Sequence, residues 1–303
     1  MRDDHGLSRI RSAQRFCGED DVGFRPRLFL RQLIRQRFTT LPEPPAPRSC
    51  LNLNLAGKVA LVTGATGEIG RAISRTLAAC GADVVVHCHR NRERAEALCE
   101  EVKALGVRSC ITGSDVTYLD SVAAMKDDIS RTLGSVDIVV VNAISWHAKT
   151  TVLELPIEEF EEVYRTCVVQ AVNLAKVFVP GMIERRWGRI IGISSEVAMQ
   201  ALSHTGPYTA GKRGLDGVLR VLAREVGPYQ ITVNQVAPGW VISDRDRSEA
   251  TERRLEYESS VPLQRRGFDQ DVANTVAFLA SNLAGFISGV YLPVCGGNVM
   301  PAI

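Results

Sequence analysis

Short runs of Val, Ile, Leu and Ala alternate with amphipathic stretches along the chain from residue 57 onward. The short runs are continuously apolar, which is typical of strands buried on both faces. The stretches between them repeat apolar residues every three or four positions, which predicts helices. We expect strands at Lys58 to Thr63, Asp83 to Cys88, Arg108 to Thr112, Asp137 to Asn142, Arg189 to Ser194, Thr232 to Val236 and Val290 to Val294. We expect helices at 69–80, 91–105, 119–133, 157–186, 207–226, 246–258 and 269–281.

Strict alternation of strand and helix predicts the α/β class, with a doubly wound sheet of seven parallel strands and helices on both faces. In such sheets ligands bind beyond the carboxyl ends of the strands, near the point where the strand order reverses. Residues that carry chemistry are therefore expected directly after strands. Suitable residues stand there: Gly64 after the first strand, Asp115 after the third, Asn142 at the end of the fourth, Ser194 and Ser195 at the end of the fifth and "APGW" after the sixth.

The stretch "TGATGEIG", residues 63–70, joins the first strand to the first helix and holds Gly64, Gly67 and Gly70. Glycines at such a turn let backbone N–H groups at the helix start approach an anion, as in a site for a dinucleotide phosphate. A turn that only closes the connection is the alternative for this motif alone. Glu68 is unexpected among these glycines, because a carboxylate repels a phosphate unless it points away.

Tyr208 and Lys212 are four residues apart on the expected helix 207–226, so their side chains project from one face. An ammonium group beside a phenol favours the phenolate form, which can exchange a proton with a substrate oxygen. Ser195, at the end of the preceding strand, can hold that oxygen with its hydroxyl. Such a pair taken alone is usually part of a solvated helix face, so this assignment depends on the other motifs.

Together these motifs resemble the short-chain dehydrogenase/reductase family, in the branch that includes 3-oxoacyl-(acyl-carrier-protein) reductases, over about Leu55 to Met300. "GRIIGISS" ends at Ser195, thirteen residues before Tyr208, which is the family's spacing. "TGATGEIG" resembles the family's TGxxxGxG turn, "DVT" at 115–117 its adenine-side motif, and "VNAI" at 141–144 its NNAG motif. "VNQVAPGW" at 233–240 resembles the segment that closes over the nicotinamide, and "GVYLPVCGG" at 289–297 resembles the family's last strand. The resemblance implies a Rossmann-like fold and reversible hydride transfer between a nicotinamide cofactor and a carbonyl or alcohol.

The resemblance also implies residue roles. Tyr208 is the general acid for carbonyl reduction, Lys212 makes its phenol more acidic and binds the nicotinamide ribose, and Ser195 positions the carbonyl. The implied cofactor-binding residues are Gly64, Gly67, Ile69, Gly70, Asp115, Val116, Asn142, Ala143, Pro238, Gly239 and Val241, together with Tyr208 and Lys212. No metal is implied. The five histidines show no ligand spacing, and His87 and His89 are interpreted as strand packing or edge exposure.

The end of the second strand, "VVVHCHRNRERAE", bears on the choice of cofactor. NAD-specific relatives usually place an acid there to accept from the ribose 2′-hydroxyl, whereas this chain has His89, Arg90 and Asn91. The Arg90 guanidinium suits the 2′-phosphate of NADP, so NADP(H) is favoured over NAD(H). Two observations oppose this: NADP-using relatives often carry a basic residue at the position of Gly67, and Arg90 can simply begin a solvated helix.

The chain departs from the family pattern at four positions. Glu68 replaces the middle glycine, and Cys167 stands where the family places an Asn that orders a water-linked proton path. A thiol is a poor substitute for a carboxamide in hydrogen bonding, so we expect slower proton resupply and reduced turnover without loss of activity. Val141 and Ile144 replace the first Asn and the Gly of NNAG, and both are apolar and tolerable.

Composition excludes several classes of protein. Residues 1–50 hold ten Arg and six acidic residues, which leaves 26 basic and 28 acidic residues in 51–303. This near-neutral body gives no argument for nucleic-acid binding. The eight cysteines lack metal-ligand spacing, so we expect reduced thiols in a cytoplasmic protein. The uncharged stretch 272–303 is interrupted by Gly, Pro and polar residues, so no membrane span is expected there.

Two parts of the chain are expected. Residues 1–50 are predicted to be a poorly ordered N-terminal extension, and 51–303 a single dinucleotide-binding catalytic domain. The segment "FRPRLFLRQLIRQRF", residues 24–38, is basic and amphipathic. A mitochondrial targeting segment is therefore the alternative, although nearby acidic residues such as Asp20 and Asp21 are out of character for one.

The leading hypothesis is an NADP-dependent reductase of 3-oxoacyl thioesters, carried by acyl carrier protein or CoA. The alternatives are a small-ketone, sugar or polyol dehydrogenase of the same family and, in another class, a non-catalytic NAD(P)-binding sensor or scaffold. Acyl carrier proteins are acidic, so a basic entrance would favour them as partners, and Arg185 and Arg186 are candidates for it. The resemblance implies a homotetramer or homodimer assembled through helices 157–186 and 207–226.

Overall fold

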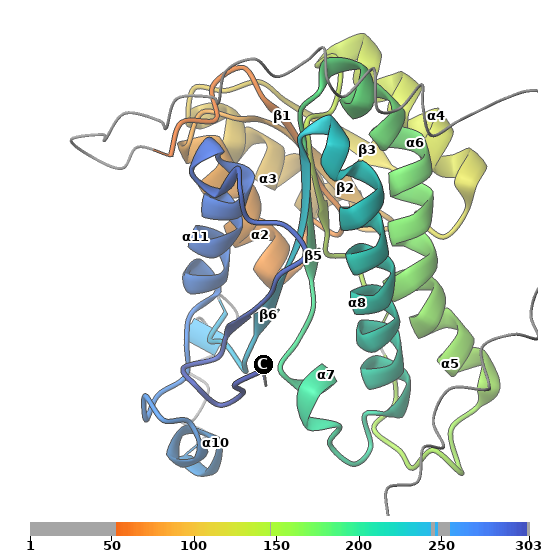
Figure 1. Ribbon diagram of the computed structural model, residues 1–303, viewed down its shortest axis with the longest axis vertical. Coiled ribbons are helices and arrows are strands. Elements are labelled where there is room, and N and C mark those ends of the chain that lie inside the picture. The colour runs from red at the N-terminus through yellow and green to blue at the C-terminus, as the bar shows by residue number, and fades with distance from the viewer. Residues whose placement is uncertain (1–52, 146, 244–245, 248–254, 302–303) are drawn as a thin grey trace, which may run out of the picture. The chain divides into compact units, whose positions relative to one another are not determined.

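Seven parallel strands form the centre of the fold, in the order β3-β2-β1-β4-β5-β6-β7 (Figure 1). The computed structural model describes residues 53–145, 147–243, 246–247 and 255–301, all within the compact unit Asn52–Ile303. The strands are β1 (Val59–Val62), β2 (Asp83–Cys88), β3 (Ser109–Gly113), β4 (Ile138–Val141), β5 (Gly188–Ile193), β6 (Ile231–Pro238) and β7 (Tyr291–Val294). The parallel seven-stranded α/β sheet expected from the sequence is confirmed.

Helices connect successive strands. The longer ones are α2 (Glu68–Ala79), α3 (Arg92–Ala104), α4 (Leu119–Thr132), α5 (Ile157–Tyr164), α6 (Gln170–Arg185), α8 (Gly206–Val226) and α11 (Asp269–Ala280). A π-helical segment, η1 (Arg165–Val169), joins α5 to α6. The shorter helices are α7 (Val197–Gln200), η2 (Gly227–Tyr229), α10 (Leu255–Ser260) and η3 (Asn282–Ala284).

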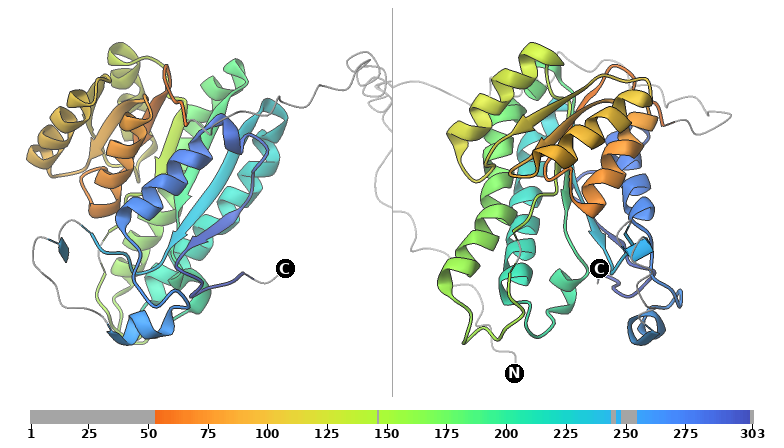
Figure 2. Two further views of the ribbon diagram at one scale, coloured as in Figure 1. Left: turned by 90° about the vertical axis from the view of Figure 1, so that its left-hand side faces the viewer. Right: turned by 180° about the vertical axis from the view of Figure 1, so that it is seen from behind.

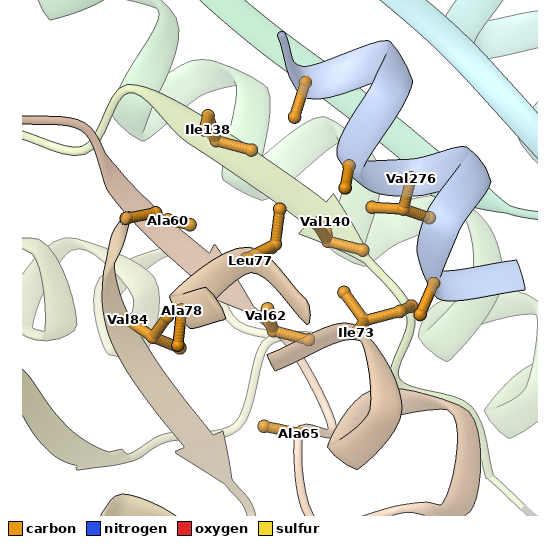
Figure 3. Packing of buried hydrophobic residues seen from close by; sticks show 14 of the residues in the cluster. Ala60, Val62, Ala65, Ile73, Leu77, Ala78, Val84, Ile138, Val140 and Val276 are labelled. Carbon is orange, nitrogen blue, oxygen red and sulfur yellow. The ribbon is translucent and has the colours of Figure 1, made fainter. Parts of the chain in front are cut away.

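The helices form a layer on each side of the sheet (Figures 1 and 2). Helices α2, α3 and α11 pack on one face, and α4, α6 and α8 pack on the other. Because side chains alternate along a strand, Ala60 and Val62 of β1 point into the first core, and Val59 and Leu61 into the second. Figure 3 shows the first core, in which side chains of α2, of the neighbouring α11 and of the strands meet. The labelled side chains are Ala60, Val62, Ala65, Ile73, Leu77, Ala78, Val84, Ile138, Val140 and Val276.

The strand order reverses between β1 and β4, which lie side by side although two strands separate them in the sequence. Their carboxyl ends are tied together by the side-chain amide of Asn142, which donates to the carbonyl oxygens of Thr63 at 2.8 Å and Gly64 at 3.1 Å. The Thr63 hydroxyl in turn accepts from the backbone N–H groups of Asn142 and Ala143. Asn142 therefore holds the glycine turn against the end of β4.

Helices α5, η1 and α6 form one continuous helix, Ile157–Arg185, that is apolar and long enough to cross a membrane by length and composition alone. Half of its most apolar window is buried in the fold. Leu174, Val177 and Phe178 pack in the core on one side of the sheet. This helix is therefore part of the core.

The structure differs from the sequence expectation in a few places. Strand β6 extends two residues beyond Val236, to Pro238, because it pairs with β7 along this stretch. The short helix α7 was not expected. Of the helix expected at 246–258, residues 248–254 lie outside the described residues, and α10 begins at Leu255. The extension expected at 1–50 also lies outside the described residues and stays a prediction.

Candidate active site

A cavity of about 700 Å³ lies beyond the ends of β1, β2, β3 and β4, where the strand order reverses. Nine residues expected to bind a cofactor line it: Gly64, Gly67, Ile69, Gly70, Arg90, Asp115, Val116, Asn142 and Ala143. The remaining lining residues are Thr66, Glu68, His87, His89, Asn91, Ser114, Ile144, Ser145, Glu162 and Thr166. The structure thus brings residues from four strand ends to one cavity, as the parallel topology requires.

The glycine turn at this cavity has no room for side chains at two positions. Gly64 has φ +60°, and a Cβ there would lie 2.9 Å from the Cα of Ala143. A Cβ on Gly70 would lie 2.4 Å from the carbonyl oxygen of Gly64. Helix α2 begins at Glu68 directly after the turn, so the positive end of its dipole and its first backbone N–H groups lie at the cavity. This arrangement suits a phosphate group.

Glu68 is paired with a base rather than isolated. Its Oε2 accepts from Nη2 of Arg71, one helical turn further on, at 2.9 Å. Both side chains are partly exposed, at 28% and 24%. The guanidinium offsets the carboxylate charge at the start of α2. The repulsion between Glu68 and a phosphate is therefore weaker than the sequence alone suggested.

His87 contacts the glycine turn directly, a role that the sequence interpretation as strand packing missed. It is 1% exposed, and its Nδ1 lies 3.1 Å from the backbone nitrogen of Gly64. Because that nitrogen can only donate, Nδ1 accepts and the ring proton is on Nε2, which lies 3.0 Å from the carbonyl oxygen of Ser114. His87 therefore joins the ends of β1 and β3 in its neutral form. Burial lowers the pKa of His87 to about 4.

This histidine gives the protein a specific pH dependence. Between pH 6.5 and 4 the unfolded chain binds a proton at position 87 that the folded chain does not, so the free energy of unfolding falls as the pH falls. From pH 7 to pH 5 this group removes about 2 kcal/mol. Urea unfolding at both pH values is expected to show that loss in the wild type but not in His87→Asn. An equal loss in the two proteins would contradict this assignment.

Asp115, which follows β3, lines the same cavity. Burial opposes its ionisation, but hydrogen bonds from the hydroxyl and backbone N–H of Thr117, together with the nearby His89 and Arg165, outweigh it and hold the pKa of Asp115 below its ordinary value. His89 Nε2 lies 3.9 Å from Asp115 Oδ2. The carboxylate is thus ionised and fixed in orientation beside the end of β2.

Ser195, Tyr208 and Lys212 lie beyond β5 and in the first turns of α8. Lys212 is 3% exposed, and its Nζ donates to the carbonyl oxygen of Ile193 at 2.6 Å and lies 5.5 Å from the centre of the Tyr208 ring. The Ser195 hydroxyl oxygen accepts from the backbone N–H of Val197 at 3.2 Å. The Tyr208 ring is stacked on His147, with ring centres 5.9 Å apart. The sequence gave no sign of this histidine contact, because residue 147 follows a different strand.

The residues expected at the nicotinamide end lie at the carboxyl end of β6 and directly after it. Gly239 donates its backbone N–H to the carbonyl oxygen of Val294 at 3.0 Å, and Pro238 is the last residue of β6. Among the described residues that line the 700 Å³ cavity, Pro238, Gly239 and Val241 are absent, and so are Ser195, Tyr208 and Lys212. The cavity therefore accounts for the adenosine and phosphate portion of the expected site, and the second group lies at the ends of the neighbouring strands.

Cys167 lies in the π-helical segment η1 and is 1% exposed. A Cβ on Gly211 of α8 would lie 2.9 Å from its Sγ, so the thiol packs one residue away from Lys212. Burial raises the pKa of the Cys167 thiol, and Lys212 opposes this. The sequence resemblance linked position 167 to a proton path, and the structure places its thiol near Lys212. The π-helical geometry was not expected.

The structure places the two arginines suggested as a basic entrance away from the candidate site. Arg185 donates to the carbonyl oxygen of Val136 and lies 3.5 Å from Asp137, before β4, and Arg186 donates to Pro228. Both arginines lie at the amino end of the sheet, so the suggestion that they form a basic entrance to the site was wrong. Within the part of the chain that the structure describes, the six cysteines are free and no cluster of His, Cys, Asp and Glu has metal-binding geometry.

A doubly wound parallel sheet with a glycine turn at its reversal point, and a Ser, Tyr and Lys beyond the adjacent strands, defines a nicotinamide-dependent oxidoreductase. The family model described as enoyl-(acyl carrier protein) reductase matches residues 64–298. The chain belongs to the short-chain dehydrogenase/reductase family.

Relatives match over most of the chain. It is 38% identical over 248 residues to the 3-oxoacyl-[acyl-carrier-protein] reductases FabG of Pseudomonas aeruginosa and Escherichia coli K12, covering 82% of this chain and all of each relative. Among solved structures, NAD⁺-bound xylitol dehydrogenase is 28% identical with a TM-score of 0.74, covering 80% of this chain and 99% of that one. A putative short-chain alcohol dehydrogenase from Sinorhizobium meliloti has the same identity and TM-score, covering 82% and 98%. The family resemblance seen in the sequence is confirmed.

Proposed function

We propose that this chain is an NADP(H)-dependent reductase of 3-oxoacyl thioesters, with acyl carrier protein or CoA as the carrier. The observation that carries the proposal is its 38% identity to 3-oxoacyl-[acyl-carrier-protein] reductases over their full length. The group formed by Ser195, Tyr208 and Lys212, at the ends of the neighbouring strands, also supports the proposal. A hydroxyl and a phenol can hold and protonate a keto oxygen, and an ammonium group can stabilise the phenolate.

The shape and lining of the cavity support the binding of the adenosine and phosphate portion of a dinucleotide. The crowding at Gly64 and Gly70 leaves backbone rather than side chains at the start of α2, and the 700 Å³ volume suits an adenosine with its phosphates. Gly64, Gly67, Ile69 and Gly70 would hold the phosphates, Asp115 and Val116 the adenine, and Asn142 and Ala143 the adenosine. Pro238, Gly239 and Val241 would hold the nicotinamide end. The bound cofactor supplies the hydride.

The side chains of this protein supply the remaining chemistry. The Ser195 oxygen accepts from Val197, which leaves its hydrogen available to the keto oxygen of the substrate. The Tyr208 phenol donates a proton to the same oxygen as negative charge develops there. Lys212, held by the Ile193 carbonyl, keeps a positive charge beside the phenol ring and stabilises the phenolate that remains.

We attribute the preference for NADP(H) to Arg90, which lines the cavity at the end of β2. In Arg90→Ala the dissociation constant of NADPH is expected to rise about tenfold, while that of NADH changes by less than about twofold, because only NADPH offers a phosphate to the guanidinium. Titration of cofactor fluorescence measures both constants. Arg92→Ala is the matched control, since Arg92 is exposed and paired with Glu96 on α3.

A second candidate function is oxidation of a polyol or sugar, favoured by the structural similarity to xylitol dehydrogenase. Following cofactor absorbance at 340 nm separates the two. We expect NADPH oxidation with acetoacetyl-CoA and with an acetoacetyl-loaded acyl carrier protein, and little NAD(P)⁺ reduction with xylitol. The opposite pattern would favour the polyol dehydrogenase. Tight cofactor binding without turnover of any substrate would indicate a sensor.

A further inference from the structure

Glu196 directly follows Ser195 and has no part in the chemistry described above. It is only 3% exposed. Among the described residues, no Lys, Arg or His nitrogen lies within ion-pair distance of its carboxylate. Burial of a carboxylate without a cation is costly, and hydrogen bonds must offset that cost.

Both carboxylate oxygens accept hydrogen bonds from distant parts of the chain. Oε1 accepts from the hydroxyl of Tyr257 in α10 at 2.8 Å. Oε2 accepts from the side-chain amide of Asn298, which follows β7, at 3.0 Å. The backbone N–H of Glu196 donates to the carbonyl oxygen of Pro238 at 2.9 Å. One residue therefore connects the end of β5 to the end of β6, to α10 and to the C-terminal segment.

Tyr257 is also held from the β6 side. Its hydroxyl accepts from the backbone N–H of Trp240 at 2.8 Å, and the two rings meet edge to face with centres 5.6 Å apart. A Cβ on Gly239 would lie 2.6 Å from the Tyr257 hydroxyl and 3.0 Å from Oε2 of Glu196. Burial raises the pKa of Tyr257, and the bond to Glu196 raises it further, so the hydroxyl stays a donor.

These contacts lie where the substrate is expected. Ser195 precedes Glu196, and Gly239 is a proposed nicotinamide contact. Helices α7 and α10 lie beyond the same end of the sheet as the carboxyl ends of β5 and β6, at the lower end in Figure 1. The hydrogen-bonded group of Glu196, Tyr257 and Asn298, which we call the carboxylate clamp, therefore borders the site at which a keto group would meet Ser195.

We propose that Glu196 is a positioning residue, whose carboxylate clamp fixes α10 and the C-terminal segment against the loop that carries Ser195 and so builds one wall of the substrate site before substrate binds. The inference rests on the proposed function for its kinetic consequence. The wall itself is a property of the protein without substrate. Glu196 acts through its partners and need not touch the reacting atoms.

A swap of hydrogen-bond polarity tests the clamp kinetically. In Glu196→Gln the carboxylate becomes an uncharged amide, so the charge-assisted hydrogen bonds from Tyr257 and Asn298 are replaced by weaker neutral ones. KM for acetoacetyl-CoA is expected to rise about tenfold, with kcat changed less than about threefold. Adding Asn298→Asp supplies an acceptor for that amide and should return KM to within about threefold of the wild type. A double variant as impaired as Glu196→Gln would overturn the proposal.

Hydrogen–deuterium exchange of the full chain without substrate tests the wall independently. Tyr257→Phe removes one oxygen atom only, and we expect amides of 255–260 to exchange about tenfold faster in it and in Glu196→Gln. The exchange rates of peptides from β1 and α2 should stay at their wild-type values in both variants. Glu256 is an exposed residue on the same helix, so in the control Glu256→Gln the exchange at 255–260 should also stay at the wild-type rate. Unchanged exchange at 255–260 in both variants would refute the clamp. Failure of acetoacetyl-CoA turnover in the wild type would refute the proposed function and leave this exchange result to decide the clamp.

Discussion

The variant Tyr208→Phe is expected to lose about a thousandfold in kcat for the reduction of acetoacetyl-CoA, with its fold intact. The substitution removes only the hydroxyl that we propose as the proton donor, and Lys212 stays bound to the Ile193 carbonyl because that contact does not involve the phenol oxygen. The dissociation constant of NADPH, measured by fluorescence titration, should change by less than about threefold.

The matched control for this variant is Tyr229→Phe. Tyr229 lies in η2, beyond the opposite end of α8, and is 37% exposed. It should retain full activity and the wild-type unfolding midpoint. If Tyr208→Phe kept more than about a tenth of the wild-type kcat, a group other than this phenol would donate the proton.

The variant Gly70→Ala is expected to abolish cofactor binding at the glycine turn. Its Cβ would lie 2.4 Å from the carbonyl oxygen of Gly64 and 2.9 Å from the Cα of Ala65, both in the backbone, so α2 must move away from β1. We expect the dissociation constant of NADPH to rise at least about a hundredfold. The free energy of unfolding should fall by about 2 kcal/mol, because the displaced helix loses core packing.

Gly217→Ala on α8 is the matched control, because a Cβ there meets no atom within 4 Å. Alanine favours a helix, so this variant should be more stable by up to about 1 kcal/mol and bind cofactor normally. Fluorescence titration and urea unfolding of both variants make the comparison. Equal cofactor affinity in the two would show that the phosphates do not depend on this turn.

The fold and the cavity were predictable from the sequence for a physical reason. Continuously apolar strands must be covered on both faces, and in a parallel sheet the strand ends converge, so residues such as Gly64, Asp115 and Asn142 were expected at one site. The cavity contains them and Arg90. Local pattern and topology were sufficient, because each of these residues lies within two residues of the end of a strand.

The contacts that the sequence did not predict depend on side chains meeting across large sequence separations. His87 contacts Gly64, 23 residues earlier, and Glu196 contacts Tyr257, 61 residues later. One signal was present for His87: it is a polar residue in an otherwise apolar strand, and a buried imidazole requires hydrogen-bond partners. For Glu196, nothing in the spacing indicated that a carboxylate at this position is buried.

The π-helical segment Arg165–Val169 has a consequence for comparisons within the family. A π turn holds one more residue than an α turn, and each residue rotates a helix by about 100°. The segment therefore changes which side chains of α6 point the same way as those of α5. Val163 of α5 packs with Cys167, and Leu174 of α6 packs in the core on one face of the sheet. A relative without the extra residue would present a different side chain to Lys212. The residues of relatives that correspond to Cys167 should therefore be identified by superposing backbones rather than by counting along the sequence. An insertion or deletion of one residue in this segment would change the side chains around Lys212 without altering the sheet.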